Sequence, residues 1–270
     1  MDVDLNGRIC LVTGANRGIG LATSTLLARA GAEVVLACRD PARASAAVRE
    51  IGSPRVHHLL VDLASQQSIR ELAAAFRSRW PRLDILVNNA AVVAEHRQTT
   101  VDGRELTFAV NHLAYFLLTR LLLDLVQAAD DGVVVNVAAT NHRDIVSGAE
   151  DLDSLDGYDL RTAYKRSKLA NISFTLELAR RLGSSARANC FCPDVVDTAL
   201  LAQFRRGRTA GLTPGKPPDT AARIAVGLAT SPGTGRYLEE GRDIEPSPLA
   251  RDPALAARLW NRCSVLTGLH

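Results

Sequence analysis

The sequence predicts an α/β protein in which one doubly wound, parallel sheet of about seven strands is flanked by helices. Short runs rich in β-branched residues alternate with segments whose apolar residues recur at helical spacing. A glycine cluster directly follows the first of these runs, where a tight turn would join strand to helix. Because strands that alternate with helices pair in parallel, this order indicates one sheet with helices on both faces.

Each element follows from the local pattern of apolar residues. The expected strands are 9–13, 33–38, 56–62, 83–87, 133–137, 186–192 and 235–238. The expected helices begin near Ile19 and cover 41–51, 65–80, 103–128, 162–182, 219–230 and 253–263. Two long loops remain, one from 138 to about 160 and one at 199–220. The second is rich in Gly, Pro, Arg and Thr, as either a flap over a ligand cleft or an ordinary surface insertion would be.

Composition limits the classes of function. The 270 residues are 47% hydrophobic and show no linker-like shift, so 1–270 is expected to be a single domain with 199–220 as its substrate-loop region. The net charge is only +3 and the basic residues are scattered, which argues against a nucleic-acid partner. The longest apolar run, 113–126, is broken by Thr119, Arg120 and Asp124, which argues against a membrane span. The N-terminus lacks an export signal, so we expect a cytoplasmic protein.

Cysteine usage is also informative. The five cysteines are an odd number, and Cys10, Cys38, Cys190 and Cys192 lie in expected strands, where cysteine behaves as a small buried hydrophobe. Cys190 and Cys192 would share one face of a strand. No further Cys/His pair completes a zinc site, so no metal is expected.

The glycine cluster predicts a dinucleotide site. Glycines at the turn permit close backbone approach, and the N-terminus of the following helix favours a pyrophosphate. The context of strand, loop and helix gives the motif its weight. The loop residues expected to bind the cofactor are Gly14, Asn16, Arg17, Gly18, Ile19 and Gly20.

The end of the second strand favours NADP(H) over NAD(H). Arg39 follows Cys38, and with Arg17 it could place two guanidiniums on a ribose 2′-phosphate. Asp40 leaves an alternative open: it could be the acid that holds the 2′-hydroxyl of NAD, or it could cap the helix that starts near Pro41.

Several further motifs follow in a familiar order. The chain resembles the classical short-chain dehydrogenases/reductases, and its finer detail is most similar to the retinol dehydrogenase-like branch. The resemblance covers nearly the whole chain. It rests on the GxxxGxG spacing of Gly14, Gly18 and Gly20, on Asp62-Leu63, Asn88-Asn89-Ala90-Ala91, Asn111, Tyr164-Lys165-Arg166-Ser167-Lys168 and 193–198, and on the stretches VNHLAYFLLT, SKLANISFTLELARRL and RLWNRCS.

The resemblance implies specific cofactor contacts. Asp62 would bind the adenine amine, Asn88 would support the adenosine ribose, and Thr198 would hold the nicotinamide carboxamide. The remaining implied cofactor-binding residues are Leu63, Ala90, Tyr164, Lys168, Pro193 and Val196.

Tyr164 and Lys168 form the expected catalytic pair. They are four residues apart in an expected helix and therefore share one face. An adjacent ammonium, together with an oxidised nicotinamide, would lower the pKa of the phenol toward the working range. The resemblance assigns Tyr164 as acid/base and Lys168 as its activator and nicotinamide-ribose ligand. It also implies that the backbone of Asn111 bends its helix and holds a water that links Lys168 to solvent.

Two positions depart from the family pattern. Where the family has Asn-Val-Ser-Ser, this chain has Asn136-Val137-Ala138-Ala139, and Ala139 cannot donate a hydrogen bond to the substrate carbonyl. Thr140 is the nearest hydroxyl that could replace the serine, and His142 is a second candidate donor; both could also be ordinary loop residues.

The second departure is Asp194, where the family has glycine after Pro193. A carboxylate there would favour NADP⁺ over NADPH and could transfer a proton itself. It could equally be a solvent-facing aspartate in a turn.

Together these features predict an NADPH-dependent carbonyl reductase or alcohol dehydrogenase for a bulky apolar small molecule. The composition, with only Lys165, Lys168 and Lys216 as lysines, is typical of GC-rich bacterial genomes and by association suggests a polyketide-like secondary metabolite. The substrate would lie between 92–98, 141–160 and 199–215.

Two alternatives remain on the same scaffold. One is a non-redox cyclase, isomerase or dehydratase that uses Tyr164, Asp194 or His142 as acid/base, and the other is a cofactor-binding module without turnover. Family members commonly form dimers or tetramers through the helices around 105–128 and 162–182, so a homodimer or homotetramer is an open expectation.

Overall fold

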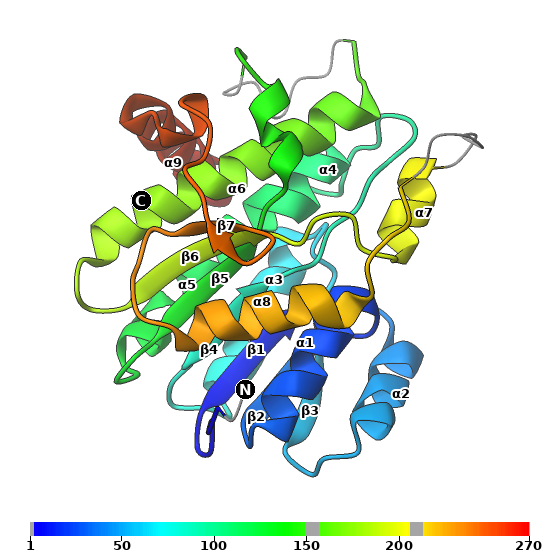
Figure 1. The fold of residues 1–270 in the computed structure, drawn as a ribbon, viewed down its shortest axis with the longest axis vertical. Coiled ribbons are helices and arrows are strands. Elements are labelled where there is room, and N and C mark those ends of the chain that lie inside the picture. The colour runs from blue at the N-terminus through cyan, green and yellow to red at the C-terminus, as the bar shows by residue number, and fades with distance from the viewer. Residues whose placement is uncertain (1–2, 149–156, 206–212, 270) are drawn as a thin grey trace.

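One eight-stranded sheet organises the chain (Figure 1). The computed structural model describes residues 3–148, 157–205 and 213–269. The strand order is β3-β2-β1-β4-β5-β6-β7-β8, and β1 to β7 pair in parallel, as the sequence predicts. The strands are β1 (Ile9–Thr13), β2 (Glu33–Cys38), β3 (Val56–Leu60), β4 (Ile85–Asn88), β5 (Val133–Val137), β6 (Arg187–Cys192), β7 (Tyr237–Glu239) and β8 (Arg242–Asp243). The two-residue β8 is antiparallel to β7 and is an addition to the predicted seven strands.

The helices lie close to their predicted positions. They are α1 (Gly18–Arg29), α2 (Pro41–Ile51), α3 (Gln66–Arg77), α4 (Leu106–Phe108), α5 (Ala114–Gln127), α6 (Leu160–Leu182), α7 (Ala199–Arg205), α8 (Pro218–Thr230) and α9 (Pro253–Thr267). The two long loops were predicted wrongly in part. The first contains a 3-10 helix at Thr140–Asp144 and the second contains α7, because helices of five to seven residues are too short to show a helical period in sequence.

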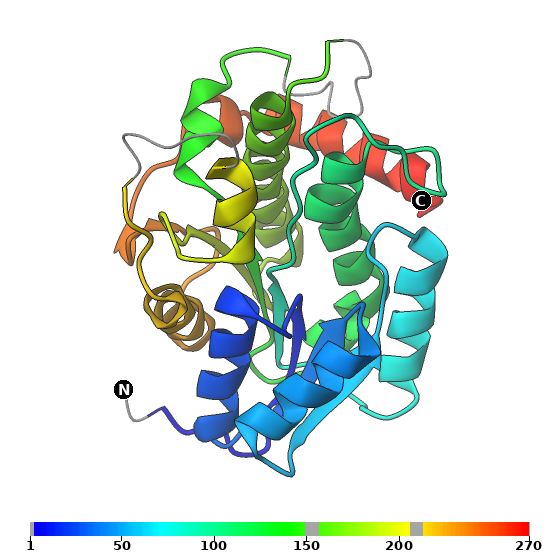
Figure 2. The same ribbon diagram turned by 90° about the vertical axis from the view of Figure 1, so that its right-hand side faces the viewer.

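Helices cover both faces of the sheet (Figures 1 and 2). Apolar residues of α1, α2 and α8 pack on one face, and those of α3, α5 and α6 pack on the other. All residues of β1 and β5 are buried, which explains why these strands read as continuous apolar runs rather than alternating ones. Since the chain crosses from β3 on one side of β1 to β4 on the other, the carboxyl ends of β1 and β4 flank the point where a doubly wound sheet binds its ligand.

The most apolar helix belongs to the core. The segment Leu106–Gln127 is long and apolar enough to cross a membrane, but 78% of its most apolar window is buried inside the fold. Its α5 part packs on β4 and β5 beside α3, as a core helix does.

The C-terminal helix α9 covers part of the surface through which an oligomer was expected. Trp260 of α9 packs against Phe116 of α5 and Phe174 of α6, with ring centroids 5.1 and 5.8 Å apart, and the guanidinium of Arg181 stacks 4.1 Å from the indole. A dimer built on α5 and α6 would have to include or displace α9. The homodimer or homotetramer therefore stays a prediction.

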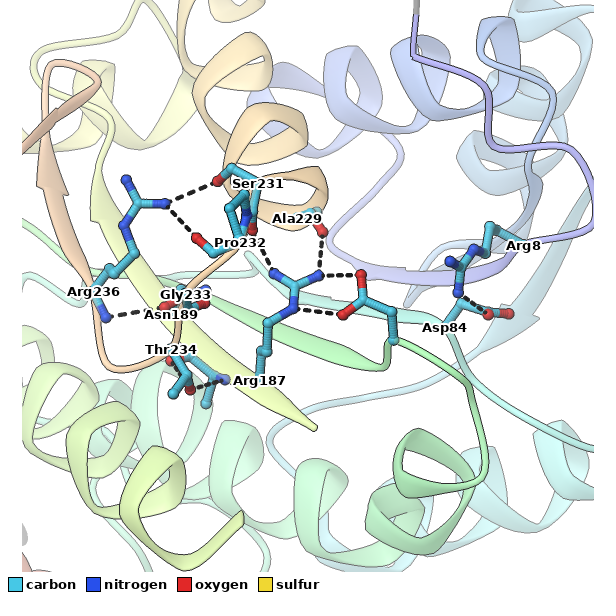
Figure 3. Close-up of polar contacts among 12 residues, drawn as sticks. Arg8, Asp84, Arg187, Asn189, Ala229, Ser231, Pro232, Gly233, Thr234 and Arg236 are labelled. Carbon is cyan, nitrogen blue, oxygen red and sulfur yellow. Dashed lines mark hydrogen bonds and ion pairs between the residues drawn. The ribbon is translucent and has the colours of Figure 1, made fainter. Parts of the chain in front are cut away.

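A polar cluster ties the sheet to α8 at the end opposite the glycine loop (Figure 3). Arg187 at the start of β6 forms a bidentate ion pair with Asp131, through contacts of 2.7 and 2.8 Å. It also donates to the carbonyls of Ser231 and Ala229 at the end of α8, at 2.7 and 3.1 Å. The Arg187 side chain is 14% exposed and that of Asp131 is 52% exposed, so the contacts with α8 are better shielded from water than the ion pair. One guanidinium thus holds the loop before β5, the start of β6 and the end of α8 together.

We expect Arg187→Ala to lower the free energy of unfolding by about 2 kcal/mol, because four hydrogen-bond acceptors lose their donor at once. The matched control is Arg43→Ala on α2, whose exposed ion pair with Asp40 spans 3.5 Å and should contribute less than about 0.5 kcal/mol. Urea denaturation measures both. Equal effects of the two variants would show that the cluster does not stabilise the fold.

Candidate active site

The glycine loop between β1 and α1 has a geometry that only glycine fits. Gly14 and Gly18 have φ of +63° and +55°. A Cβ on Gly20 would lie 2.6 Å from Nδ2 of Asn89 and still closer to the carbonyl oxygen of Gly14. The loop therefore forms an open backbone cradle at the N-terminus of α1, the arrangement that binds a dinucleotide pyrophosphate.

Thr13 and Asn89 hold this cradle in place. The Thr13 hydroxyl accepts from the backbone amides of Asn89 and Ala90 at 2.9 and 3.1 Å, and Nδ2 of Asn89 donates to the Thr13 carbonyl at 2.8 Å. The loops after β1 and β4 are thereby joined. Sequence reasoning gave neither side chain a role, although Asn89 lies inside a motif that it used and Thr13 directly precedes Gly14.

The loop after β6 closes the cradle from the other side. A Cβ on Gly18 would lie 3.2 Å from Cγ2 of Thr198, so Thr198 packs against the glycine loop. Its hydroxyl accepts from the amide of Leu201 at 3.3 Å and caps α7. The bound carboxamide that the sequence assigns to Thr198 would compete with this weak contact. Pro193 begins this loop, and the buried Val196 anchors it in the core.

The end of β2 carries two exposed cations. Arg17 and Arg39 are both exposed, and neither forms an ion pair within the described residues. Asp40 accepts from the amide of Arg43 at 3.0 Å and is the N-cap of α2. Of the two sequence-based interpretations of Asp40, the structure shows the cap.

The residues expected around the adenosine differ in accessibility. Asp62 is partly exposed and accepts from the amide of Ala64 at 3.0 Å. Leu63 is buried in the core, so only its backbone is available to a ligand. Asn88 is fully buried and donates to Thr119 and Asn136 at 3.0 and 2.9 Å, so its side chain joins β4 to β5 and α5. The expectation that Asn88 supports the adenosine ribose stays a prediction.

Tyr164 and Lys168 lie on the face of α6 that packs over the carboxyl ends of β5 and β6. Nζ of Lys168 lies 5.5 Å from the Tyr164 ring centroid and donates to the carbonyl of Val137 at 3.0 Å. Burial lowers the pKa of Lys168 to about 7 and raises the pKa of Tyr164 above its usual range. In the protein alone, Tyr164 is thus held in its proton-donating form. The expected lowering of its pKa depends on an oxidised nicotinamide as well as on Lys168, so it stays a prediction.

The helix that carries Asn111 is irregular at the place where the resemblance implies a bend. A π-helical turn, Ala109–Leu113, interrupts the path from α4 to α5. The Asn111 side chain exchanges two hydrogen bonds with the backbone of Val92, at 2.8 and 2.9 Å. Its carbonyl, which was expected to hold a water, accepts from Nδ2 of Asn171 at 2.9 Å.

Asn171 and His112 extend this buried network. Nδ2 of Asn171 also donates to the Val137 carbonyl at 3.2 Å, the same acceptor that Lys168 uses. Oδ1 of Asn171 lies 2.9 Å from Nδ1 of His112. Burial lowers the pKa of His112 to about 4, so the imidazole is neutral and donates through Nδ1. Sequence reasoning missed Asn171, although it lies three residues after Lys168.

The residues just after β5 are Ala138, Ala139 and Thr140, and the first hydroxyl in this segment is that of Thr140. Ala139 is extended and only partly exposed, and Thr140 begins the 3-10 helix with its side chain exposed. The Thr140 hydroxyl lies 2.9 Å from Sγ of Cys192 at the end of β6. Cys192 follows Phe191, which pairs with Val137, and the Val137 carbonyl accepts from Lys168. Thr140, Cys192 and Lys168 thus lie at the same edge of the sheet.

His142 and Asp194 are engaged elsewhere. His142 is fully buried, with Nδ1 at 2.8 Å from the Ala139 carbonyl and Nε2 accepting from the amide of Ser247 at 3.1 Å. With both nitrogens satisfied, His142 is not placed to donate to a substrate. Asp194 has φ of +63° and forms an ion pair of 2.7 Å with Lys216, which lowers the pKa of its carboxyl. The ion pair offsets the negative charge that was expected to bias the cofactor.

Two aromatic side chains flank the catalytic pair and were missed by sequence reasoning. The Tyr115 hydroxyl donates to the Ala90 carbonyl at 2.9 Å, and its ring centroid lies 5.6 Å from Nζ of Lys168. Phe204 of α7 packs edge-on against the Tyr164 ring, with centroids 4.7 Å apart. The segment 199–205 therefore reaches Tyr164. Parts of the expected substrate region, 149–156 and 206–212, lie outside the described residues.

Within the described residues, no group of three His, Cys, Asp or Glu side chains is arranged to hold a metal ion. All five cysteines are buried as free thiols.

Comparison with known proteins identifies the class that this fold and site define. Residues 8–209 match the family model described as short chain dehydrogenase, and the chain belongs to this family. Human retinol dehydrogenase 13 is 38% identical over 292 residues, which cover 98% of this chain and 86% of that protein. Within its family, the chain is therefore close to the retinol dehydrogenase branch.

Solved structures agree with this assignment. The crystal structure of an uncharacterised protein from Mycobacterium paratuberculosis aligns with a TM-score of 0.83 and 32% identity, over 98% of this chain and 95% of that one. A short chain dehydrogenase from Shigella flexneri, complexed with NADP, aligns with a TM-score of 0.71 and 26% identity, over 90% of this chain and 100% of that one.

The low pKa of Lys168 predicts a pH dependence. Its ammonium is present below about pH 7 and is lost above it, while Tyr164 stays protonated. Because the ammonium stabilises the phenolate that remains after proton donation, kcat/KM for carbonyl reduction should fall as the pH rises through about 7. Initial rates between pH 5 and 9 measure this fall in kcat/KM, the basic limb of the pH profile.

The matched variants are Lys168→Met and Lys165→Met. Lys165 lies on the same helix but forms an ion pair of 2.7 Å with Asp144, so its removal should leave the limb unchanged. The residual activity of Lys168→Met should lack it. A limb that persists in Lys168→Met would assign the titration to another group.

Proposed function

We propose that this protein is an NADPH-dependent carbonyl reductase, reversibly an alcohol dehydrogenase, for a bulky apolar substrate. The observation that carries the proposal is that Lys168, with Tyr164 beside it, is bonded to the carboxyl end of β5, at the sheet edge where the glycine cradle follows β1. The cofactor supplies or accepts the hydride when it is bound. The chain's own residues must then bind the cofactor, orient the substrate carbonyl and move one proton.

Each of these tasks has a candidate residue. Tyr164 donates its phenolic proton to the carbonyl oxygen, and the Lys168 ammonium stabilises the phenolate that remains. The Thr140 hydroxyl donates a hydrogen bond to the same oxygen, in place of the serine that is absent at Ala139. In the oxidative direction Tyr164 takes the proton back from the alcohol.

NADP(H) is favoured over NAD(H) by the charges at the end of β2. Arg17 and Arg39 are exposed and unpaired within the described residues, while Asp40 is engaged as the cap of α2. Two guanidiniums without a competing acid suit a ribose 2′-phosphate. The similarity to a structure complexed with NADP agrees with this choice.

The surroundings of Tyr164 favour an apolar substrate. The ring of Phe204 covers one edge of Tyr164, and α7 has no fully buried residue of its own. The similarity to human retinol dehydrogenase 13 favours an isoprenoid alcohol or aldehyde over the polyketide-like molecule suggested by composition. We take an isoprenoid aldehyde as the substrate class to test first.

The non-redox alternative loses support. It needed Tyr164, Asp194 or His142 as acid/base, and two of these three are occupied by Lys216 and by the buried contacts of His142. Tyr164 alone serves the redox reaction equally well.

Reduction of retinaldehyde with NADPH tests the proposal. Tyr164→Phe should lower kcat by about 10³-fold, because the proton donor is lost while the ring remains. The control is Tyr237→Phe in β7, a buried core tyrosine whose hydroxyl plays no part in the proposal. If Tyr164→Phe is as active as Tyr237→Phe, the mechanism is wrong.

A further inference from the structure

The junction between the ends of β5 and β6 contains a sulfur atom with an unusual set of contacts. Sγ of Cys192 accepts from the backbone amide of Thr140 at 3.1 Å and from that of Asp194 at 3.3 Å. It also lies 2.9 Å from Oγ1 of Thr140, where either atom can be the donor. Cys192 is 4% exposed, whereas Thr140 is exposed. The buried thiol of Cys192 is thus hydrogen-bonded to the hydroxyl of Thr140, which we propose as the replacement for the missing serine.

The direction of the third hydrogen bond decides what Thr140 can do. If the hydroxyl donated to sulfur, its proton would be used and could not reach a substrate. A thiol offers one weak donor and a weak acceptor, and here two backbone amides already use the acceptor. The sulfur can then take part in the third hydrogen bond only as a donor, through its S–H group, and its third partner is Oγ1 of Thr140.

We propose that Cys192 is a positioning residue: its S–H donates to Oγ1 of Thr140 and leaves the Thr140 O–H free to donate to the substrate carbonyl. The hydroxyl cannot rotate back toward sulfur without facing the S–H proton. Cys192 therefore supplies orientation rather than chemistry. This inference rests on the proposed function, in which Thr140 takes over from the absent serine at Ala139.

The positive φ of Asp194 contributes to this hydrogen-bond arrangement around Cys192. Asp194 has φ of +63°, a region that residues other than glycine rarely adopt. Its carboxylate is held by Lys216 at 2.7 Å, and Lys216 also contacts Glu240 at 3.1 Å. This ion pair keeps the loop in the conformation that points the Asp194 amide at Sγ. The aspartate that replaces the family's glycine thus helps to saturate the sulfur as an acceptor.

Infrared spectroscopy tests the direction of the bond without any reaction. The difference between the spectra of the wild-type protein and Cys192→Ser isolates the S–H stretching band of Cys192 from those of the other four cysteines. Thr140→Val removes the acceptor while it keeps the side-chain shape. We expect the Cys192 band to move to higher wavenumber in Thr140→Val, because a donating S–H loses its partner. A band that does not move means that the hydroxyl donates to sulfur, and the inference is then wrong.

Kinetics test the consequence. Thr140→Val should lower kcat for retinaldehyde reduction by about 100-fold, and Cys192→Ala by about 10-fold with little change in KM. The double variant should be no slower than Thr140→Val alone, since Cys192 acts only through Thr140. Cys192→Ser, which keeps a donor, should retain most of the activity. The matched control is Cys190→Ala, a buried thiol two residues earlier on the same strand, which should leave kcat nearly unchanged.

Rescue separates this inference from a loss of folding. Ala139→Ser restores a hydroxyl at the neighbouring position, so it should recover activity in the Cys192→Ala background. Multiplicative losses in the double variant, or no rescue by Ala139→Ser, would overturn the positioning role. A wild-type protein that reduces no carbonyl would instead refute the proposed function, and the infrared result would still decide the direction of the bond.

Discussion

The carbonyl oxygen of Val137 is the acceptor on which the catalytic end of the molecule depends. It lies at the last residue of β5 and accepts from both Lys168 and Asn171, at 3.0 and 3.2 Å. Both donors lie on α6, so this carbonyl ties α6 to the end of β5. It thereby helps to position Tyr164, which lies on the same helix. Asn171 connects the same point to the π-helical turn through the Asn111 carbonyl. A buried amide without these partners would cost free energy, so the network holds as a unit.

The two departures from the family pattern, Ala139 and Asp194, lie on either side of Cys192 at the end of β6. Ala139 removes a hydroxyl from the end of β5, and Thr140, Cys192 and Asp194 meet directly beside it. Taken singly, Ala139 looks like a lost function and Asp194 like an added charge. In the mechanism that we propose, the hydroxyl of Thr140 replaces the serine hydroxyl one residue further along the chain, and Cys192 of β6 sets its orientation. The ion pair of Asp194 with Lys216 is then part of the support rather than of the chemistry.

The sequence predicted the sheet well, and the site residues that it singled out stay a prediction. Parallel strands buried on both faces leave continuous apolar runs, and the glycine spacing and the Tyr164–Lys168 pair are local in sequence, so each could be found without a structure. The shared acceptor of Lys168 and Asn171 could not, because it depends on how α6 packs against β5. The same holds for Cys192, which looks like a core residue in its strand but receives two amides from separate loops. The contacts of Asn88 with Thr119 and Asn136 could not be predicted either, because its motif does not show which way the side chain points.

Transfer of deuterium from 4-deuterated NADPH to retinaldehyde tests the central claim most directly. The account predicts retinol that carries one deuterium at the former carbonyl carbon, formed by the wild-type protein and not by Tyr164→Phe. Mass spectrometry of the alcohol measures both. Retinaldehyde that is recovered unlabelled and unreduced, from protein that binds NADPH, would contradict the assignment of this site to carbonyl reduction of an isoprenoid aldehyde.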